Sequence, residues 1–478
     1  MEMAGFWMLA LVALGLVATG LPAFIVLIGV AVSFSALGVV TGVVSYHFLA
    51  AVPARITGLL ESDILQALPL YVLMGALLNR LPLADILFRA GAQALSRTRS
   101  APLLAAIGLG ALLAPMSGSV GASVATLSRI VQPKLVACGV PRAQSLATIC
   151  VASTLGVVVP PSLVLILLGD AMLRAHSEAI NTTGIMARAI NTQDVFRGAL
   201  VPSAIFLSLC FVLAWWTGHG AHRDGAGTSA PDRLTMRGWL TAILTLLSIL
   251  GLLVAVVSGR VYAVEGAAAG GFALVLFGFA TGTLGTEPLR LILRDTMAVT
   301  GALFALLVAA TTFTLVFRAF GTDRALATII LQIPGTAAGA VIAVLALLWL
   351  CAFVLDAFEI IFVIIPLVMP PLLTRVPDAV WVSVLALLTL QSSFLLPPFG
   401  YAVMMARTRI EGSVAFAPLA RALAPFLAAQ IIVLGLAVAC PLLTHLAESA
   451  TAAQHPLSDE EVKKRLEEMV PADTPDSE

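Results

Sequence analysis

Two short stretches in the first half of the chain decide the fold: Pro115-Met116-Ser117-Gly118-Ser119-Val120-Gly121 and Thr154-Leu155-Gly156-Val157-Val158-Val159-Pro160-Pro161-Ser162. Each of them interrupts a long apolar run. An unbroken transmembrane helix needs about 20 mostly apolar residues, and proline disrupts it because proline removes a backbone donor. We therefore predict a re-entrant hairpin with its tip at 117–119, followed by a helix broken at Pro160-Pro161.

Both features recur in the second half of the chain at one sequence offset. Pro160-Pro161 and Pro397-Pro398 are 237 positions apart, and so are Pro133 and Pro370. The second half is therefore predicted to hold its own polar-tipped hairpin and its own broken helix. Paired broken helices in corresponding positions of two halves indicate the binding site of a transporter.

Composition places these helices in a membrane. The 478 residues are 60% hydrophobic and only 11% charged, whereas a soluble domain carries roughly 25% charged residues. Backbone groups in a bilayer have no water to bond, so helices are the default spanning form. The period-2 alternation of an outer-membrane barrel is absent from the sequence. We predict an all-α polytopic membrane protein made of two repeats, each with a re-entrant hairpin and a broken helix.

The chain divides into four segments. Residues 1–217 and 237–446 are expected to form the two repeats, each with scaffold helices, a hairpin and a broken helix. Between them, residues 218–236 are rich in Gly, Asp and Arg, which is typical of a linker. Residues 447–478 turn polar and acidic, and we expect them to form a mobile tail.

Basic residues set the predicted orientation, because short cytoplasmic loops are enriched in Arg and Lys. Only Arg375 lies near the base of the second hairpin, whereas the base of the first is surrounded by Arg89, Arg97, Arg99, Arg129, Lys134 and Arg142. Hairpin one is therefore predicted to enter from the cytoplasm and hairpin two from outside. The two repeats would then be inverted.

The interrupted segments hold the candidate site residues. Half-helix ends leave N–H and C=O groups unpaired near the midplane, where N–H ends favour an anion and C=O ends favour a cation. The candidates at the first tip and before the two breaks are Ser117, Gly118, Ser119, Thr154, Gly156, Gln391, Ser392 and Ser393. The breaks are expected to act as hinges at Pro160, Pro161, Pro397 and Pro398.

Asp356 stands at the predicted tip of the second hairpin, because the offset of 237 takes Ser119 to this position. A charged side chain at the centre of a membrane helix costs about 2.5–3.5 kcal/mol on insertion scales. Burial without a partner is therefore not expected. Two roles stay open: Asp356 helps to hold a cation, or it caps a half-helix amide as aspartate does at helix starts.

Other classes of function lack their motifs. The six histidines form no His-Glu-x-x-His pattern, which a helical zinc protease would need. No Gly-Lys-Ser/Thr phosphate loop is present, so ATP-driven pumping by this chain is not expected. The net charge is zero and no long basic run suggests a nucleic-acid partner. A secondary transporter, rather than an enzyme, is the predicted class, and a channel is the harder alternative to separate.

Several segments resemble a known family. They are Pro115–Ser119, Ala122–Leu127, Thr154–Ser162, Phe196–Pro202, Val264–Ala269, Phe353–Pro366 and Leu395–Gly400. On these segments, residues 1 to about 446 resemble the large membrane subunit of TRAP (tripartite ATP-independent periplasmic) transporters. The chain departs from the family pattern at Ser393-Phe394-Leu395-Leu396, where Gly-Leu-Leu-Thr is usual, and at Ala357, where proline is usual.

The resemblance implies a sodium-driven, elevator-type importer of organic acids in the bacterial inner membrane. It implies two partners, a small four-helix membrane subunit and a periplasmic substrate-binding protein. It assigns the carboxylate substrate to Ser117, Gly118, Ser119, Thr154, Gly156, Gln391 and Ser392, and the sodium ions to Ser119, Gly156, Asp356 and Ser393. A single-component sodium–carboxylate symporter of related fold is the nearest alternative.

Overall fold

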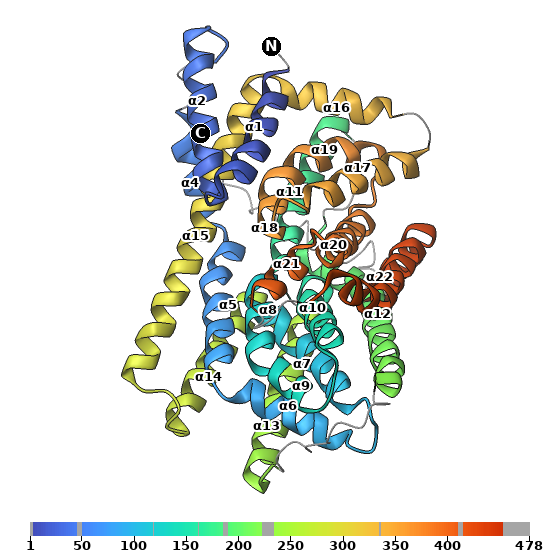
Figure 1. Ribbon diagram of the computed structural model, residues 1–478. Coiled ribbons are helices and arrows are strands. Elements are labelled where there is room, and N and C mark those ends of the chain that lie inside the picture. The colour runs from blue at the N-terminus through green and yellow to red at the C-terminus, as the bar shows by residue number, and fades with distance from the viewer. Residues whose placement is uncertain are drawn as a thin grey trace, which may run out of the picture.

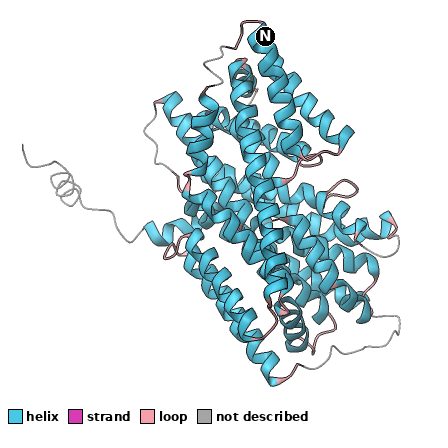
Figure 2. Ribbon diagram, turned by 90° about the vertical axis from the view of Figure 1, so that its left-hand side faces the viewer, coloured by secondary structure: helices cyan, strands magenta, loops and turns pink. Residues whose placement is uncertain are grey.

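The computed structural model describes residues 3–44, 50–117, 119–160, 162–184, 190–221, 234–333, 336–409 and 414–452. This part of the chain is almost entirely helical and contains no strand (Figure 2). Eight of its helical segments are long and apolar enough to cross a membrane, or nine if the bent pair α4–α5 forms one span. The predicted all-α, multi-spanning fold is confirmed. The linker residues 222–233 and the tail from 453 onward lie outside the described residues.

A first group of helices includes the long helix α15, which runs along one side of the molecule with α5 beside it (Figure 1). The group takes five helices from the first half, namely α1 (Ala4–Thr19), α2 (Ala23–Val40), α4 (Ala51–Leu60), α5 (Asp63–Arg80) and α6 (Leu83–Ala94). It takes four from the second half, namely α13 (Met236–Val257), α14 (Ala263–Ala280), α15 (Thr286–Ala319) and α16 (Thr322–Gln332).

The two halves exchange packing partners within this group. Helix α2 of the first half packs on α15 of the second, and α14 of the second packs on α5 of the first. Helices α2 and α14 begin at residues 23 and 263, and α6 and α16 begin at residues 83 and 322, so their offsets stay close to the predicted 237. Such reciprocal pairing is what a two-fold relation between repeats produces, in agreement with the predicted fold.

Both predicted hairpins are present as pairs of helices interrupted by a tip. Hairpin one consists of α7 (Ala101–Ser117) and α8 (Val120–Ile130), with the short α9 (Gln132–Ala137) after it. Hairpin two consists of α17 (Ala337–Cys351) and a return arm made of α18 (Ala357–Glu359), the π-helix η1 (Ile360–Ile364) and α19 (Ile365–Arg375). The return arm of hairpin two has 19 residues, which by length and composition is enough to cross a membrane by itself.

Both predicted helix breaks are present as well. The first separates α10 (Arg142–Val158) from α11 (Leu163–Thr183), and the second separates α20 (Ala379–Leu395) from α21 (Tyr401–Thr408). Each second half packs on the return arm of the opposite hairpin: α11 packs on α19, and α21 packs on α8. The helices α12 (Thr192–Ala221), α22 (Phe416–Ala439) and α23 (Leu442–Ala452) complete the fold.

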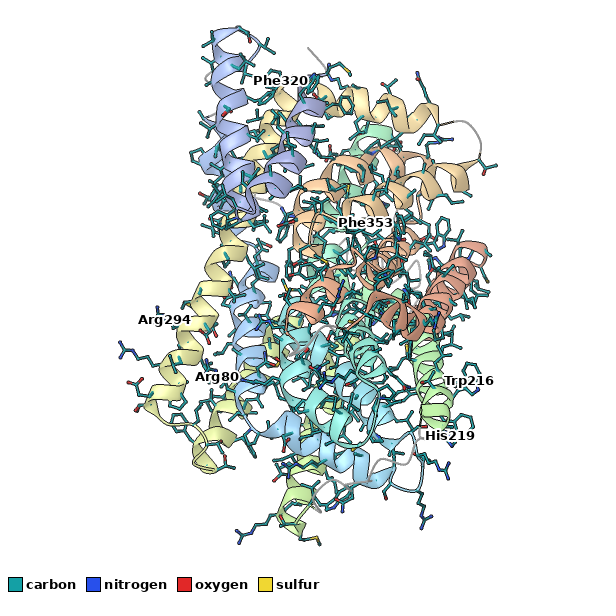
Figure 3. All side chains as sticks on the ribbon, in the orientation of Figure 1. Arg80, Trp216, His219, Arg294, Phe320 and Phe353 are labelled. Carbon is teal, nitrogen blue, oxygen red and sulfur yellow. The ribbon has the colours of Figure 1, made fainter. Side chains whose placement is uncertain are left out.

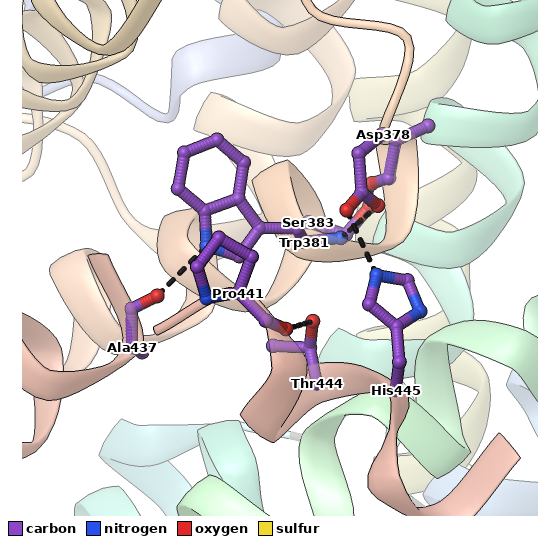
Figure 4. A network of polar contacts seen from close by, with 8 residues as sticks. Asp378, Trp381, Ser383, Ala437, Pro441, Thr444 and His445 are labelled. Atoms are coloured by element: carbon purple, nitrogen blue, oxygen red, sulfur yellow. Dashed lines mark hydrogen bonds and ion pairs between the residues drawn. The ribbon is translucent and has the colours of Figure 1, made fainter. Parts of the chain in front are cut away.

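A polar network fixes the start of α20 against the C-terminal helices (Figure 4). Asp378 accepts a hydrogen bond from the backbone N–H of Trp381 (3.0 Å) and contacts Nε2 of His445 at 2.8 Å. The indole N–H of Trp381 donates to the carbonyl of Ala437 (2.8 Å). An aspartate at this position caps the helix start, and its second oxygen links α20 to α23. The second broken helix therefore has a fixed outer end.

Small residues let α7 and α10 approach at backbone distance. A Cβ added to Gly110 would lie 2.5 Å from the Cβ of Ala152 and 2.6 Å from its carbonyl oxygen. A Cβ added to Gly156 would lie 2.5 Å from the carbonyl oxygen of Ala114. Small residues are the usual means by which membrane helices approach closely. Hairpin one and the first broken helix therefore form one packed body.

Replacing Gly110 by alanine tests this close approach. We expect Gly110→Ala to lower the Tm of the detergent-solubilised protein, because overpacking a core costs typically about 1–3 kcal/mol. Gly301 in α15 is the matched control, since a Cβ added there meets no atom within 4 Å. Gly301→Ala should leave Tm unchanged or raise it, because alanine is the better helix former. Equal Tm values for the two variants would contradict the packing described here.

Candidate functional site at the hairpin tips

A cavity of about 400 Å³ lies where the hairpins face α5 and α15. We call it the tip cavity; it is lined by Val72, Ala76, Asn79, Arg80, Ser119, Ala122, Ala125, Thr126, Arg129, Leu163, Asp295, Val299, Leu303, Phe358 and Arg409. Ser119 comes from the tip of hairpin one, Phe358 from the start of the return arm of hairpin two, and Leu163 from the first break. Both tips and the first break thus border one space.

Three half-helices start at this cavity. Ser119 is the N-cap of α8, Leu163 is the first residue of α11, and Phe358 is the second residue of α18. The first N–H groups of a helix have no partner within the helix, and the helix dipole makes that end positive. The starts of α8 and α11 therefore favour a negatively charged group, whereas the start of α18 already carries the carboxylates of Asp356 and Glu359.

The second break joins the same region through Tyr401, the first residue of α21. A Cβ added to Gly121 in α8 would lie 3.0 Å from the Tyr401 hydroxyl, so the two helices touch there. The same hydroxyl interacts electrostatically with the carboxylates of Asp356 and Glu359 in hairpin two. Tyr401 therefore contacts hairpin one and interacts with the two acids of hairpin two. The sequence offers no signal for this role, because the repeat mate of Tyr401 is the apolar Val164.

Asp356 acts as a helix cap. It is the N-cap of α18, and its Oδ1 accepts a hydrogen bond from the N–H of Ala357 at 2.7 Å. Glu359 reaches back and accepts from the N–H of Asp356 at 3.0 Å, which completes a capping box. Of the two roles left open by the sequence, capping is therefore present in the structure. The role of Asp356 toward a cation stays a prediction.

The candidates before the breaks lie inside helices rather than on the tip cavity. Thr154, Ser392 and Ser393 are buried, and their hydroxyls donate to carbonyls one turn back in their own helices, at 2.9, 2.7 and 2.8 Å. Gly156 is packed against α7, as described above. Of the candidates that the structure describes, Ser119 alone lines the tip cavity. Gly118 and Pro161 lie outside the described residues, as does the side chain of Ser117.

Gln391 is the candidate whose buried side chain lacks hydrogen-bond partners in the part of the chain that the structure describes. Its side chain is completely buried in α20, and neither its amide nitrogen nor its amide oxygen has a hydrogen-bond partner among the described residues. The hydroxyls of Thr389, two residues earlier, and of Ser153 in α10 are also buried without such a partner. Buried polar atoms are almost always hydrogen-bonded, so these atoms mark a place where a water, ion or ligand can bind. Helices α10 and α20 pack on each other.

The side chains that line the tip cavity carry a net positive charge. Its lining holds three arginines, Arg80, Arg129 and Arg409, and one acid, Asp295. Arg80 pairs with Asp295 at 3.0 Å, and Arg129 donates to the backbone carbonyl of Asn79 at 2.6 Å. The labelled side chains of Arg80 and Arg294 lie on the lower parts of α5 and α15 in Figure 3. Among the residues that the structure describes, Arg129 pairs with no acid, so its charge is available to an anionic ligand.

Comparison with known proteins identifies the family. The family model described as "Tripartite ATP-independent periplasmic transporter, DctM component" matches residues 9–443. The chain belongs to the DctM family. Together with its many apolar helices, this membership makes it a multi-pass permease of the inner membrane.

Individual relatives agree with this assignment. The C4-dicarboxylate TRAP transporter large permease protein DctM of Pseudomonas aeruginosa is 32% identical over 111 residues, which span 23% of this chain and 26% of that protein. Among solved structures, the YdaH transporter of Alcanivorax borkumensis, reported to have an unusual topology, superposes with a TM-score of 0.55 at 15% identity. That likeness covers 82% of this chain and 87% of the other, and it shows the fold alone.

Replacing Gln391 by leucine separates a structural role from a functional one in this DctM-family chain. Leucine is similar in size and removes both unpartnered amide atoms, so Gln391→Leu should leave Tm unchanged or raise it slightly. Substrate uptake should nevertheless fall at least tenfold, which corresponds to about 1.4 kcal/mol of lost interaction. Gln430→Leu is the control, because that amide nitrogen already donates to the carbonyl of Leu388 (3.0 Å) and its loss should lower Tm. Normal uptake by Gln391→Leu would exclude Gln391 from the site.

Proposed function

We propose that this chain is the permease subunit of a sodium-driven, binding-protein-dependent secondary transporter that imports a small organic acid by an elevator mechanism. The observation that supports it most directly is the tip cavity, where three half-helix starts and three arginines surround a space of about 400 Å³. The name of the Pseudomonas aeruginosa relative suggests a C4-dicarboxylate as the substrate class.

The proposed substrate site uses charge and helix ends together. One carboxylate of the substrate would lie against the starts of α8 and α11, where N–H groups and helix dipoles favour an anion. Arg129 and Arg409 would face the second carboxylate from the cavity wall. Charge-assisted hydrogen bonds of this kind are roughly twice as strong as neutral ones.

The proposed sodium sites use the opposite helix ends. Hard cations such as sodium take oxygen ligands, and the ends of α10 and α20 supply carbonyls near Thr154, Gly156 and Ser393. Among the described residues, no three His, Cys, Asp or Glu side chains gather as a metal cluster. Sodium would therefore be held by carbonyls and hydroxyls, with Ser119 and Asp356 contributing from the two tips. Breaks at the Pro-Pro pairs would let these ends adjust.

Family membership and exposed apolar surface both support the proposed partners. A small four-helix membrane subunit and a periplasmic substrate-binding protein are proposed to complete the transporter. Helices α1, α2 and α13 expose large apolar side chains, among them Trp7 (65% exposed), Val40 (85%) and Met236 (87%). Such surface is covered by lipid or by another membrane helix.

Elevator movement requires two units that slide past one another. We define the carrier unit as the two hairpins with the two broken helices, and the scaffold unit as α1, α2, α4, α5 and α13–α15. The units touch through polar contacts at the ends of α5 and α15. Asn79 accepts from Thr126 (2.8 Å) and from Arg129, while Arg318 donates to Glu178 (2.9 Å) and to the carbonyl of Pro366 (3.3 Å).

These contacts would break and re-form during each cycle. The tip cavity lies where Arg80 at the end of α5 pairs with Asp295 of α15, and the basic residues predict that this side faces the cytoplasm. The structure would accordingly represent the inward-facing state. A single-component symporter would use the same site, and its uptake would persist when the binding protein is omitted.

Sodium coupling can be tested in vesicles that contain this chain and its partner proteins. Succinate uptake should require an inward sodium gradient and no ATP. Asp356→Asn should lower the apparent sodium affinity about tenfold with Tm preserved, because asparagine also caps helices well. Glu359→Gln, which removes a charge one turn away and retains an acceptor, serves as the control. Equal uptake in sodium and in potassium alone would contradict the proposal.

Relative movement of the two units can be tested with thiol bridging. In a protein lacking its five native cysteines, Asn79→Cys is combined with Thr126→Cys, whose parent side chains touch at 2.8 Å. Mercury(II) should bridge the pair and stop uptake, and dithiothreitol should restore it. Each single cysteine variant is the control and should remain active. Undiminished uptake by the bridged double variant would rule out sliding at this contact.

A further inference from the structure

A second cavity lies on the next turns of α15. The tip cavity touches α15 at Asp295, Val299 and Leu303, whereas the second cavity touches it from Leu307 to Arg318. Asp295 and Arg318 are 23 residues apart, or about 35 Å along a helix at 1.5 Å per residue. The second cavity has a volume of about 280 Å³. A further cavity of about 200 Å³ shares Glu178, Arg318, Pro366 and Pro370 with it.

Three arginines and two acids line the second cavity: Arg55, Arg174, Arg318, Asp170 and Glu178. Both acids are already used. Asp170 pairs with Arg174 at 3.1 Å, and Glu178 pairs with Arg318 at 2.9 Å. No acid therefore remains in the lining for the third arginine.

Arg55 is that third arginine. It lies on α4, and within the described ranges it forms no ion pair. It interacts electrostatically with both Arg318, which repels it, and Glu178, which attracts it. Arg55 and Arg318 thus line one cavity, and the acid nearest to both of them is already paired with Arg318. Guanidinium groups bind carboxylates through two parallel hydrogen bonds, so a second carboxylate between Arg55 and Arg318 would balance the charge.

We propose that this cavity is an entry site for the substrate, in which Arg55 and Arg318 bind one carboxylate of a small dicarboxylic acid before it reaches the hairpin tips. The site rests on the proposed function and adds a second binding step to it. Both arginines belong to the scaffold unit, so they stay in place when the carrier unit moves. Glu178 belongs to α11 in the carrier unit.

The ion pair between Arg318 and Glu178 makes entry depend on the carrier position. With the carrier unit placed as in this structure, Glu178 occupies Arg318 and competes with an incoming carboxylate. When α11 moves away with the carrier unit, Arg318 loses that partner and is free for the substrate. Capture would then be strongest in the state that receives substrate from outside.

Arg55→Gln tests this assignment without disturbing the ion pairs. In reconstituted vesicles, it should raise the apparent KM for succinate about tenfold and change the maximal rate less than twofold. Arg55→Lys, which retains the charge and loses the fork-shaped guanidinium, should lie in between. Arg260→Gln is the matched control, because Arg260 is exposed on the α13–α14 turn and lines neither cavity. An unchanged KM in Arg55→Gln would overturn the entry site.

A binding measurement tests the entry site independently of whether the chain transports succinate. Labelled succinate is bound at equilibrium to the purified chain in phosphatidylcholine nanodiscs, in sodium-free buffer, where no anionic lipid competes. Weaker binding to Arg55→Gln than to Arg260→Gln, by about tenfold, supports the entry site even if uptake fails in every sample. Equal affinities, or competition by the uncharged succinamide as strong as by succinate itself, refute it.

Discussion

The main constraint on this structure is to find partners for backbone groups that have lost their helical hydrogen bonds. Two helices are broken and two hairpins turn inside an apolar protein, and no water is available there to bond the freed N–H and C=O groups. The chain meets this constraint locally, with Ser162 capping α11 and Asp356 capping α18. Each half-helix after a break also packs on the hairpin of the other repeat, which keeps the freed groups inside protein and away from lipid. Only the N–H groups around the tip cavity that no such cap occupies remain for a ligand.

The sequence was sufficient to predict the architecture. Proline pairs at a fixed offset marked both breaks, and small polar residues inside apolar runs marked both tips, because such residues are costly in an unbroken span. The site was predicted less well. Ser119 lines the tip cavity, but the hydroxyls of Thr154 and Ser393 bond to their own helices. A serine or threonine in a helix has this local option whatever its neighbours are, so residue type alone could not settle its direction.

Residues that connect distant segments were the ones that sequence patterns missed. Tyr401 and Arg409 follow the second break and reach the first hairpin and its cavity, and nothing in their local sequence indicates that contact. Arg55 stands near Arg318 only because α4 meets the end of α15. Charge pairing across the chain depends on three-dimensional proximity, whereas periodicity reports only which face of a helix is apolar.

The exchanged packing of the broken helices also bears on how the protein is made. Helix α11 is complete at residue 183, but α19, on which it packs, begins at residue 365. At a synthesis rate of about 5–20 residues per second, roughly 10–40 s separate the two. During that interval, the membrane holds a half-finished chain in which the face of α11 that packs on α19 has no partner. Insertion machinery, lipid or a chaperone has to cover that surface until the second repeat arrives.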